Sequence, residues 1–193
     1  MYLKRNKHLD VVALFLGDYK EQFYLREISK LAKIPLKTTQ NIMQNLEGSK
    51  VLQSHISGKN KYFSLNLNNP QAKLLILQAE LHKTAIFLEK YLIFKTFVKE
   101  IITDAPVIVF GSLAKFRANK DSDLDLLVIS RKKYSLPFHL LDYKVHQILL
   151  SEAAFIKALN KQEALIKEVE ANHIILNNHS FYVNVLWSYY GNK

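Results

Sequence analysis

Two short apolar runs, separated by a turn that carries small and acidic residues, constrain the fold of this chain more than any other feature. The first run, 105–110, ends at Gly111-Ser112, and the second, 124–129, follows Asp123 and contains Asp125. β-Branched and leucine-rich runs of this length are typical of buried strands. The residue pattern in the second half of the chain therefore predicts a strand, a short helix over 113–118 and a second strand.

The Gly111-Ser112 pair is suited to binding an anion. Glycine permits close approach of the backbone, the Ser112 hydroxyl can donate to a phosphate oxygen, and the amides of a first helical turn carry partial positive charge. We expect a phosphate group to bind here. Lys115 either adds a cation to this phosphate site or faces solvent.

Asp123 and Asp125 lie one strand repeat apart, so alternation places both on one face of the predicted strand. Two carboxylates this close repel each other, and a bridging divalent cation removes the repulsion. The chain has no cysteine, so oxygen or imidazole groups must hold any metal, and Mg²⁺ (or Mn²⁺) is the expected ion. The alternative is a solvated strand edge without a metal.

The spacing Gly111-Ser112, ten intervening residues, Asp123-Leu124-Asp125 resembles the nucleotidyltransferase superfamily of the DNA polymerase beta type, including the minimal nucleotidyltransferases. The resemblance covers about residues 103–176. It implies that Gly111 and Ser112 bind the nucleotide, with Lys115 as a further candidate, and that Asp123 and Asp125 are catalytic residues and metal ligands. The implied reaction is Mg²⁺-dependent transfer of a nucleotide, adenylyl from ATP above all, to a protein or RNA hydroxyl.

Two departures from this family pattern leave the catalytic assignment open. Members usually carry Arg-Gly where this chain has Lys115-Phe116, and a third carboxylate on a later strand where residues 144–150 offer His146. His146 is either a base or ligand, or a structural residue. The alternative function is therefore a DNA-binding transcriptional regulator or antitoxin whose nucleotidyltransferase domain is catalytically degenerate. The resemblance suggests a prokaryotic setting with a toxin of the HEPN ribonuclease family as protein partner.

The first third of the chain is the more basic part. Lys and Arg number 27 against 17 Asp and Glu, and residues 1–69 contain 11 basic and 5 acidic side chains. Apolar periodicity predicts helices over 8–16, 24–32 and 35–46, followed by strands over 51–56 and 62–67. This order resembles the winged helix-turn-helix family across residues 8–67.

The resemblance predicts DNA as a partner, because the third helix turns amide, hydroxyl and lysine side chains outward and the hairpin tip is basic. The alternative is a module for protein pairing. The expected DNA-binding residues are Lys37, Thr38, Gln40, Asn41, Gln44, Lys59, Asn60 and Lys61.

Residues 71–102 contain neither glycine nor proline, which predicts one connecting helix with room for a single break. Its leucine stripe either packs on the chain itself or forms a homodimer contact. We thus expect an α/β (α+β) protein with a winged helix-turn-helix domain (1–69), a connecting helix (70–102) and a nucleotidyltransferase domain with a small mixed sheet (103–193). With no membrane-length apolar run and no signal peptide, we expect it in the cytoplasm.

Overall fold

The computed structural model describes residues 5–119 and 121–192. Within these, the chain divides into two compact units, one made of residues 5–80 and 183–192 and the other of residues 81–182. The division falls inside two helices, α4 (Pro70–Lys90) and α9 (His179–Gly191). Each unit is described by itself.

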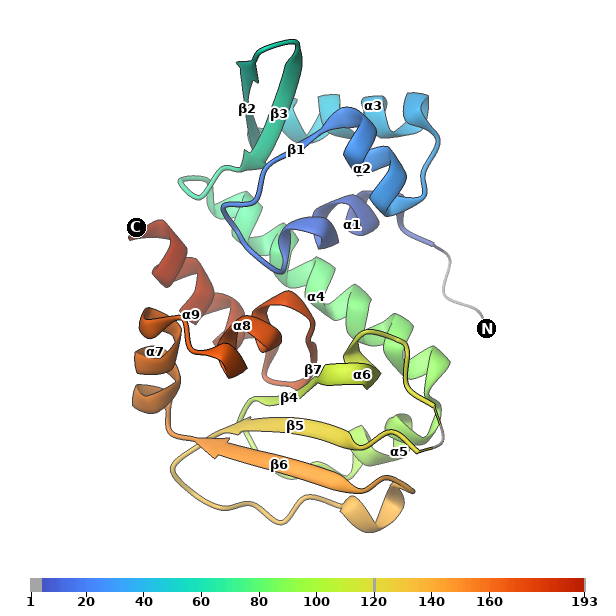
Figure 1. Cartoon of the computed structure of the whole chain (residues 1–193), viewed down its shortest axis with the longest axis vertical. Coiled ribbons are helices and arrows are strands. Elements are labelled where there is room, and N and C mark those ends of the chain that lie inside the picture. The colour runs from blue at the N-terminus through green and yellow to red at the C-terminus, as the bar shows by residue number, and fades with distance from the viewer. Residues whose placement is uncertain (1–4, 120, 193) are drawn as a thin grey trace. The chain divides into compact units, whose positions relative to one another are not determined.

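The first unit contains three short helices and a three-stranded antiparallel sheet (Figure 1). The helices are α1 (Lys7–Val12), which continues as a 3-10 turn (Ala13–Phe15), α2 (Leu25–Ala32) and α3 (Leu36–Gly48). The strands are β1 (Phe23–Tyr24), β2 (Leu52–Ser57) and β3 (Asn60–Leu65), in the order β1-β3-β2. The short strand β1 is not predicted by the sequence pattern, since two residues give no periodicity.

Local signals in the sequence set the helix ends in this unit. The Glu27 carboxylate accepts a hydrogen bond from the Tyr24 amide at 3.0 Å, which satisfies a donor that the start of α2 would otherwise leave unpaired. Lys33 ends α2 in the left-handed conformation, with φ at 54°, and Pro35 keeps Ile34 out of the helical region. α3 then buries Thr39, Ile42, Met43 and Leu46, the four residues that helical spacing over the predicted 35–46 helix places on one face.

The second unit is built around a four-stranded mixed sheet in the order β6-β5-β4-β7. The strands are β4 (Val107–Phe110), β5 (Leu124–Ile129), β6 (Val145–Leu150) and β7 (Ile174–Asn177). β5 and β6 are parallel, while β4 is antiparallel to both β5 and β7. The mixed α+β architecture with a small mixed sheet is the one predicted.

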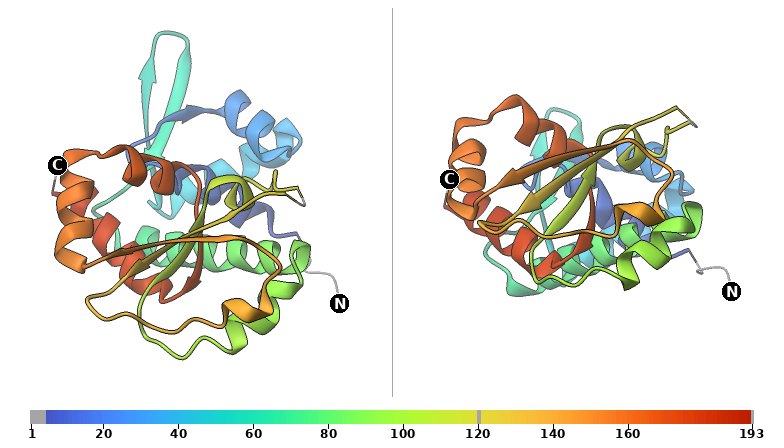
Figure 2. Two further views of the ribbon diagram at one scale, coloured as in Figure 1. Left: turned by 60° about the horizontal axis from the view of Figure 1, so that its bottom comes forward. Right: turned by 90° about the horizontal axis from the view of Figure 1, so that it is seen from below.

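Helices lie on both sides of this sheet. α5 (Ile93–Lys99) and the second half of α4 supply Phe87, Phe94 and Phe97, which pack against Val109 and Leu126 in one core. α7 (Glu152–Lys161) and α8 (Ala164–Ala171) lie on the side away from α5 (Figures 1 and 2). Ile108 and Leu127, which alternate with the first set along their strands, are fully buried as well, so both faces of the sheet are covered.

The segment after β4 differs from the prediction. The predicted helix over 113–118 is wrong in its extent, because α6 covers only Gly111–Ala114. Lys115 caps the helix, and Phe116 takes the left-handed conformation with φ at 56°. The Lys90 ammonium donates to the Phe116 carbonyl at 2.7 Å, and the Phe116 ring stacks on Tyr91. These contacts stabilise an early end to the helix.

The segment 71–102, predicted as a connecting helix with room for one break, forms two helices, since α4 ends at Lys90 and α5 begins at Ile93. Three leucines of the predicted stripe remain exposed, with 59% of Leu74, 49% of Leu81 and 63% of Leu92 accessible. Packing on the chain itself therefore leaves part of the stripe uncovered, and the homodimer stays a prediction. None of the helices in the described part of the chain has the length and apolar character needed to cross a membrane.

Candidate nucleotidyl-transfer site

Gly111 and Asp125 are in direct contact at the edge where β4 passes into α6. Phe110 pairs with Asp125 across the antiparallel strands, so the next residue, Gly111, comes against the Asp125 carboxylate. The φ angle of Gly111 is +70°, and a Cβ placed there would overlap Asp125 Oδ2. Glycine is required at this position both by the backbone conformation and by the carboxylate.

The turn before β5 positions Asp123. The Ser122 hydroxyl accepts from the Asn119 amide at 2.9 Å and also contacts Asn119 Oδ1 at 2.9 Å. The Leu124 amide then donates to the Lys144 carbonyl at 2.8 Å, which joins the start of β5 to the start of β6. Asp123 is thus held directly before the start of β5, one strand repeat before Asp125.

Both carboxylates face one imidazole. His146 lies beside Asp125 in the parallel β5–β6 register. Its Nδ1 is 3.7 Å from Asp125 Oδ1, and its Nε2 is 3.6 Å from Asp123 Oδ2. The two aspartates therefore converge on a common point, as alternation along the strand predicts. The strand position expected for a third carboxylate is occupied by His146.

Two lysines and a glutamate extend this cluster of charges. Lys144 Nζ is 4.0 Å from Asp123 Oδ2. Lys115, the residue that caps α6, forms an ion pair with Glu168 of α8 at 3.0 Å. The sequence pattern does not single out Lys144 or Glu168, because an exposed charge on a strand end or helix carries no signal of its long-range neighbour.

Burial raises the pKa of Asp125 above the ordinary value for aspartate. The negative charges of Glu168 and Asp123 act in the same direction, and the positive charges of His146 and Lys115 oppose them. The ionised carboxylate at this position is thus disfavoured in the folded chain. A further cation near Asp125 would relieve that cost.

The donor groups present fit a hard divalent cation whose remaining ligands come from the substrate and water. Asp123 and Asp125 offer carboxylate oxygens from one strand face, and Gly111 leaves room for the Asp125 carboxylate against the backbone. Mg²⁺ in phosphate-handling sites is commonly held by one or two carboxylates, with phosphates and water as its other ligands. Across residues 5–119 and 121–192, no group of three or more His, Asp or Glu side chains is arranged to hold a metal by itself.

The predicted DNA-binding residues lie in the other unit. On α3, Lys37, Asn41 and Gln44 are exposed, and Thr38 and Gln40 are half-buried. Lys59, Asn60 and Lys61 are exposed at the tip of the β2–β3 hairpin.

Glu47 of α3 joins this helix to the hairpin. One carboxylate oxygen accepts from the Lys61 ammonium at 2.7 Å, and the other accepts from the Ser54 hydroxyl at 2.5 Å. Lys61 Nζ also lies 5.2 Å from the centre of the Phe63 ring. The hairpin is thereby fixed against α3, and Lys61 is engaged inside the unit.

Comparison with known proteins finds a family model that is similar to part of the chain. Residues 93–177, from α5 to β7, match the family model of the nucleotidyltransferase domain. No curated protein and no solved structure gives a significant match. The matched segment contains Gly111, Asp123 and Asp125, and therefore the whole carboxylate cluster. Residues 93–177 are thus similar to a nucleotidyltransferase domain, which supports membership in the nucleotidyltransferase superfamily and a general function in nucleotidyl transfer.

Proposed function

We propose that the unit containing residues 93–177 transfers a nucleotide, specifically an adenylyl group from ATP, to a hydroxyl of a protein or RNA in a Mg²⁺-dependent reaction. The observation that carries this proposal is the convergence of Asp123 and Asp125 beside Gly111 within the segment that matches the nucleotidyltransferase domain. We further propose that the other unit binds DNA through α3 and the hairpin.

The residues around Gly111 have distinct roles in this proposal. Gly111 and the half-buried Ser112 bind the triphosphate by backbone and hydroxyl groups, and Lys115 adds a positive charge. Asp123 and Asp125 hold the metal ion, Mg²⁺ or Mn²⁺. When bound, that ion supplies neutralisation of the negative charge on the phosphates.

The transfer step exchanges a phosphoanhydride bond of ATP for a phosphoester bond to the acceptor. The acceptor hydroxyl oxygen forms a bond to the α-phosphorus, the bond from that phosphorus to the bridging oxygen breaks, and pyrophosphate leaves with the electron pair. The hydroxyl proton passes to solvent or to a base. Positioning and electrostatics supply most of the rate in such reactions, which is why few side chains suffice.

The decisive test is label transfer. The double variant Asp123→Asn, Asp125→Asn should lose Mg²⁺-dependent incorporation from α-labelled ATP into protein or RNA, while keeping the wild-type fold by circular dichroism. Glu152→Gln, an exposed acid at the start of α7, is the matched control and should keep full incorporation. Transfer that survives in the double variant would reject the proposal.

A second function is favoured by one observation. His146 lies within 3.7 Å of both aspartates and Lys144 within 4.0 Å of Asp123, so a lysine ammonium already balances part of the carboxylate charge and an imidazole lies beside both carboxylates. A DNA-binding regulator or antitoxin with a catalytically degenerate domain, paired with a toxin of the HEPN ribonuclease class, would have this arrangement. Calorimetry decides between the two, because the degenerate protein binds neither Mg²⁺ nor ATP and still binds DNA.

The DNA-binding proposal is supported by the exposed side of α3. Most of its exposed and half-buried side chains are amides, a hydroxyl and a lysine, together with Leu36 at its first position (45% accessible) and Glu47, whereas Ile42, Met43 and Leu46 are buried. Amide side chains pair well with adenine edges, and lysine contacts guanine or phosphate. A surface for protein pairing more often exposes several apolar anchors, whereas α3 exposes one, Leu36 at its start.

A further inference from the structure

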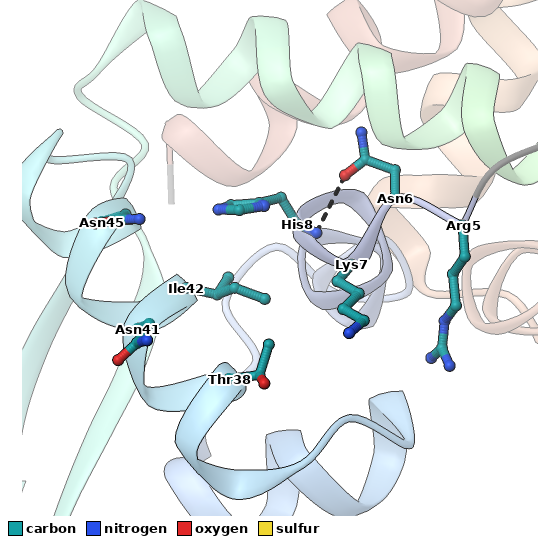
Figure 3. A pocket seen from close by; sticks show the side chains of 8 residues that line it. All are labelled: Arg5, Asn6, Lys7, His8, Thr38, Asn41, Ile42 and Asn45. Atoms are coloured by element: carbon teal, nitrogen blue, oxygen red, sulfur yellow. Dashed lines mark hydrogen bonds between the residues drawn. The ribbon is translucent and has the colours of Figure 1, made fainter.

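A cleft of about 450 Å³ lies between the amino-terminal segment of the first unit and α3 (Figure 3). One wall is the consecutive segment Arg5 to His8, and the other is a single face of α3. The α3 wall consists of Thr38, Asn41, Ile42 and Asn45. Neither the proposed base-reading residues nor the nucleotidyl-transfer site accounts for Arg5, Lys7, His8 or Asn45.

The charges in the cleft all have one sign. The ionisable side chains among its lining residues are Arg5, Lys7 and His8. The Arg5 guanidinium is anchored within the unit, since it pairs with Asp10 at 2.6 Å and donates to the Ala32 carbonyl at 2.5 Å. Within the described residues, Lys7 forms no ion pair. Arg5 therefore fixes the segment, while Lys7 supplies positive charge to the cleft.

The neutral groups in the cleft are hydrogen-bond donors as well as acceptors. Asn41 and Asn45 are exposed and lie one helical turn apart, and Thr38 lies on the same face. The Asn6 side-chain oxygen accepts from the His8 amide at 3.1 Å and the Leu9 amide at 3.2 Å.

The shape of the cleft favours an extended anion over a small enclosed ligand. Six of the eight lining residues are exposed, Thr38 is half-buried and Ile42 is buried at 3% accessibility. Pockets for small molecules generally enclose most of the ligand and are mainly apolar. An open channel with basic and amide walls instead fits a sugar–phosphate strand, whose contacts come chiefly from lysine, arginine, amide and hydroxyl groups.

We propose that this cleft binds the sugar–phosphate backbone of one strand of duplex DNA, with Lys7 and His8 on one side of the strand and Asn41 and Asn45 on the other. This inference rests on the proposed DNA-binding function and extends it from α3 to the amino-terminal segment. Because phosphate contacts are independent of base sequence, the cleft sets the position of α3 on the duplex while Lys37, Gln40 and Gln44 face the bases.

The test is the salt dependence of binding of the full-length chain to a mixed-sequence DNA duplex, followed by fluorescence anisotropy. The association constant falls as salt rises, and loss of one phosphate contact makes the negative slope of its logarithm against log salt shallower by about 0.9. Lys7→Gln should show that reduction and severalfold weaker binding, and Asn45→Ala should weaken binding with an unchanged slope. Lys7→Arg should restore the wild-type slope.

The matched control is Lys20→Gln, an exposed lysine of the same unit that does not line the cleft. It should bind as the wild-type protein does. If the wild-type protein fails to bind duplex DNA at all, the proposed DNA-binding function fails and the cleft assignment with it. If wild-type binding is weakened by Lys37→Gln but not by Lys7→Gln, only the cleft assignment is overturned.

A competition experiment distinguishes the DNA strand from a free phosphate compound. ATP or inorganic phosphate, added at constant ionic strength, should not displace the duplex from the wild-type chain. Displacement that disappears in Lys7→Gln would overturn the proposal, because it would make the cleft a site for a small anion. The melting temperature of each variant, compared with that of the wild-type protein, checks that the substitution leaves the fold intact.

Discussion

His146 and Asp125 are neighbours in the parallel β5–β6 pair, with 3.7 Å between His146 Nδ1 and Asp125 Oδ1. The same ring approaches Asp123 Oδ2 through Nε2 at 3.6 Å. One imidazole therefore spans both carboxylates of the candidate metal site. Its position on β6 is the one at which the family resemblance leads us to expect an acid.

Replacing this histidine with an acid should strengthen metal binding. In His146→Asp, three carboxylates repel one another without a cation, so we expect a lower melting temperature than wild type in a chelator. Mg²⁺ should reverse the deficit, because binding to the folded state raises its stability. The measurement is melting temperature against Mg²⁺ concentration. His139→Asp, at an exposed position of the same unit, should show no such Mg²⁺ response, and an equal response in both variants would contradict the site.

Gly111→Ala should damage both the fold and the site. A residue with a Cβ is disfavoured by about 1–2 kcal/mol in the left-handed conformation, and here the added carbon would also overlap Asp125 Oδ2. We expect a lower midpoint in urea unfolding and loss of nucleotidyl transfer. Gly48→Ala is the control, since nothing lies within 4 Å of its added carbon; a loss of stability there of similar size would show that the effect is not specific to Gly111.

Asp125→Asn should stabilise the chain at neutral pH. Burial, with Glu168 and Asp123, raises the pKa of Asp125 in the folded chain. The folded state therefore retains a proton that the unfolded state has released, and stability falls as pH rises from about the ordinary value of 3.8 through the raised value. Removing the charge should raise the melting temperature at neutral pH, and this gain should vanish below the ordinary value. Calorimetric scans across this range test the expectation; a gain that is constant with pH would refute the ionisation argument.

Lys115→Gln should raise the KM for ATP and leave kcat little changed, because the lysine contributes phosphate binding that is shared by the ground and transition states. Its ion pair with Glu168 is partly exposed, so the free energy of unfolding should change by less than about 1 kcal/mol. Steady-state kinetics and urea unfolding measure the two quantities. Lys167→Gln, an exposed neighbour of Glu168, is the control, and a KM change of equal size in that variant would exclude a specific role for Lys115.

Periodicity in the sequence determined the elements that carry both proposed sites. The apolar runs ending at Phe110 and beginning at Leu124 form β4 and β5, and α3 buries the four residues that its helical spacing places inward. These features follow from local chemistry, because strand alternation, helical spacing and glycine conformations depend on residues a few positions apart. The placement of Asp123 and Asp125 on one strand face also follows from local chemistry, because it depends only on alternation along the strand.

Only the tertiary structure decided which distant groups meet those residues. The contact of Gly111 with Asp125, the ion pair between Lys115 and Glu168, and the cleft between Lys7 and Asn45 join segments far apart in the chain. Strand order and helix packing set such contacts, and a charged side chain on an exposed helix gives no local sign of its partner. The early end of α6 has the same origin, since Lys90 and Tyr91 hold Phe116 in a conformation that helical spacing does not foresee.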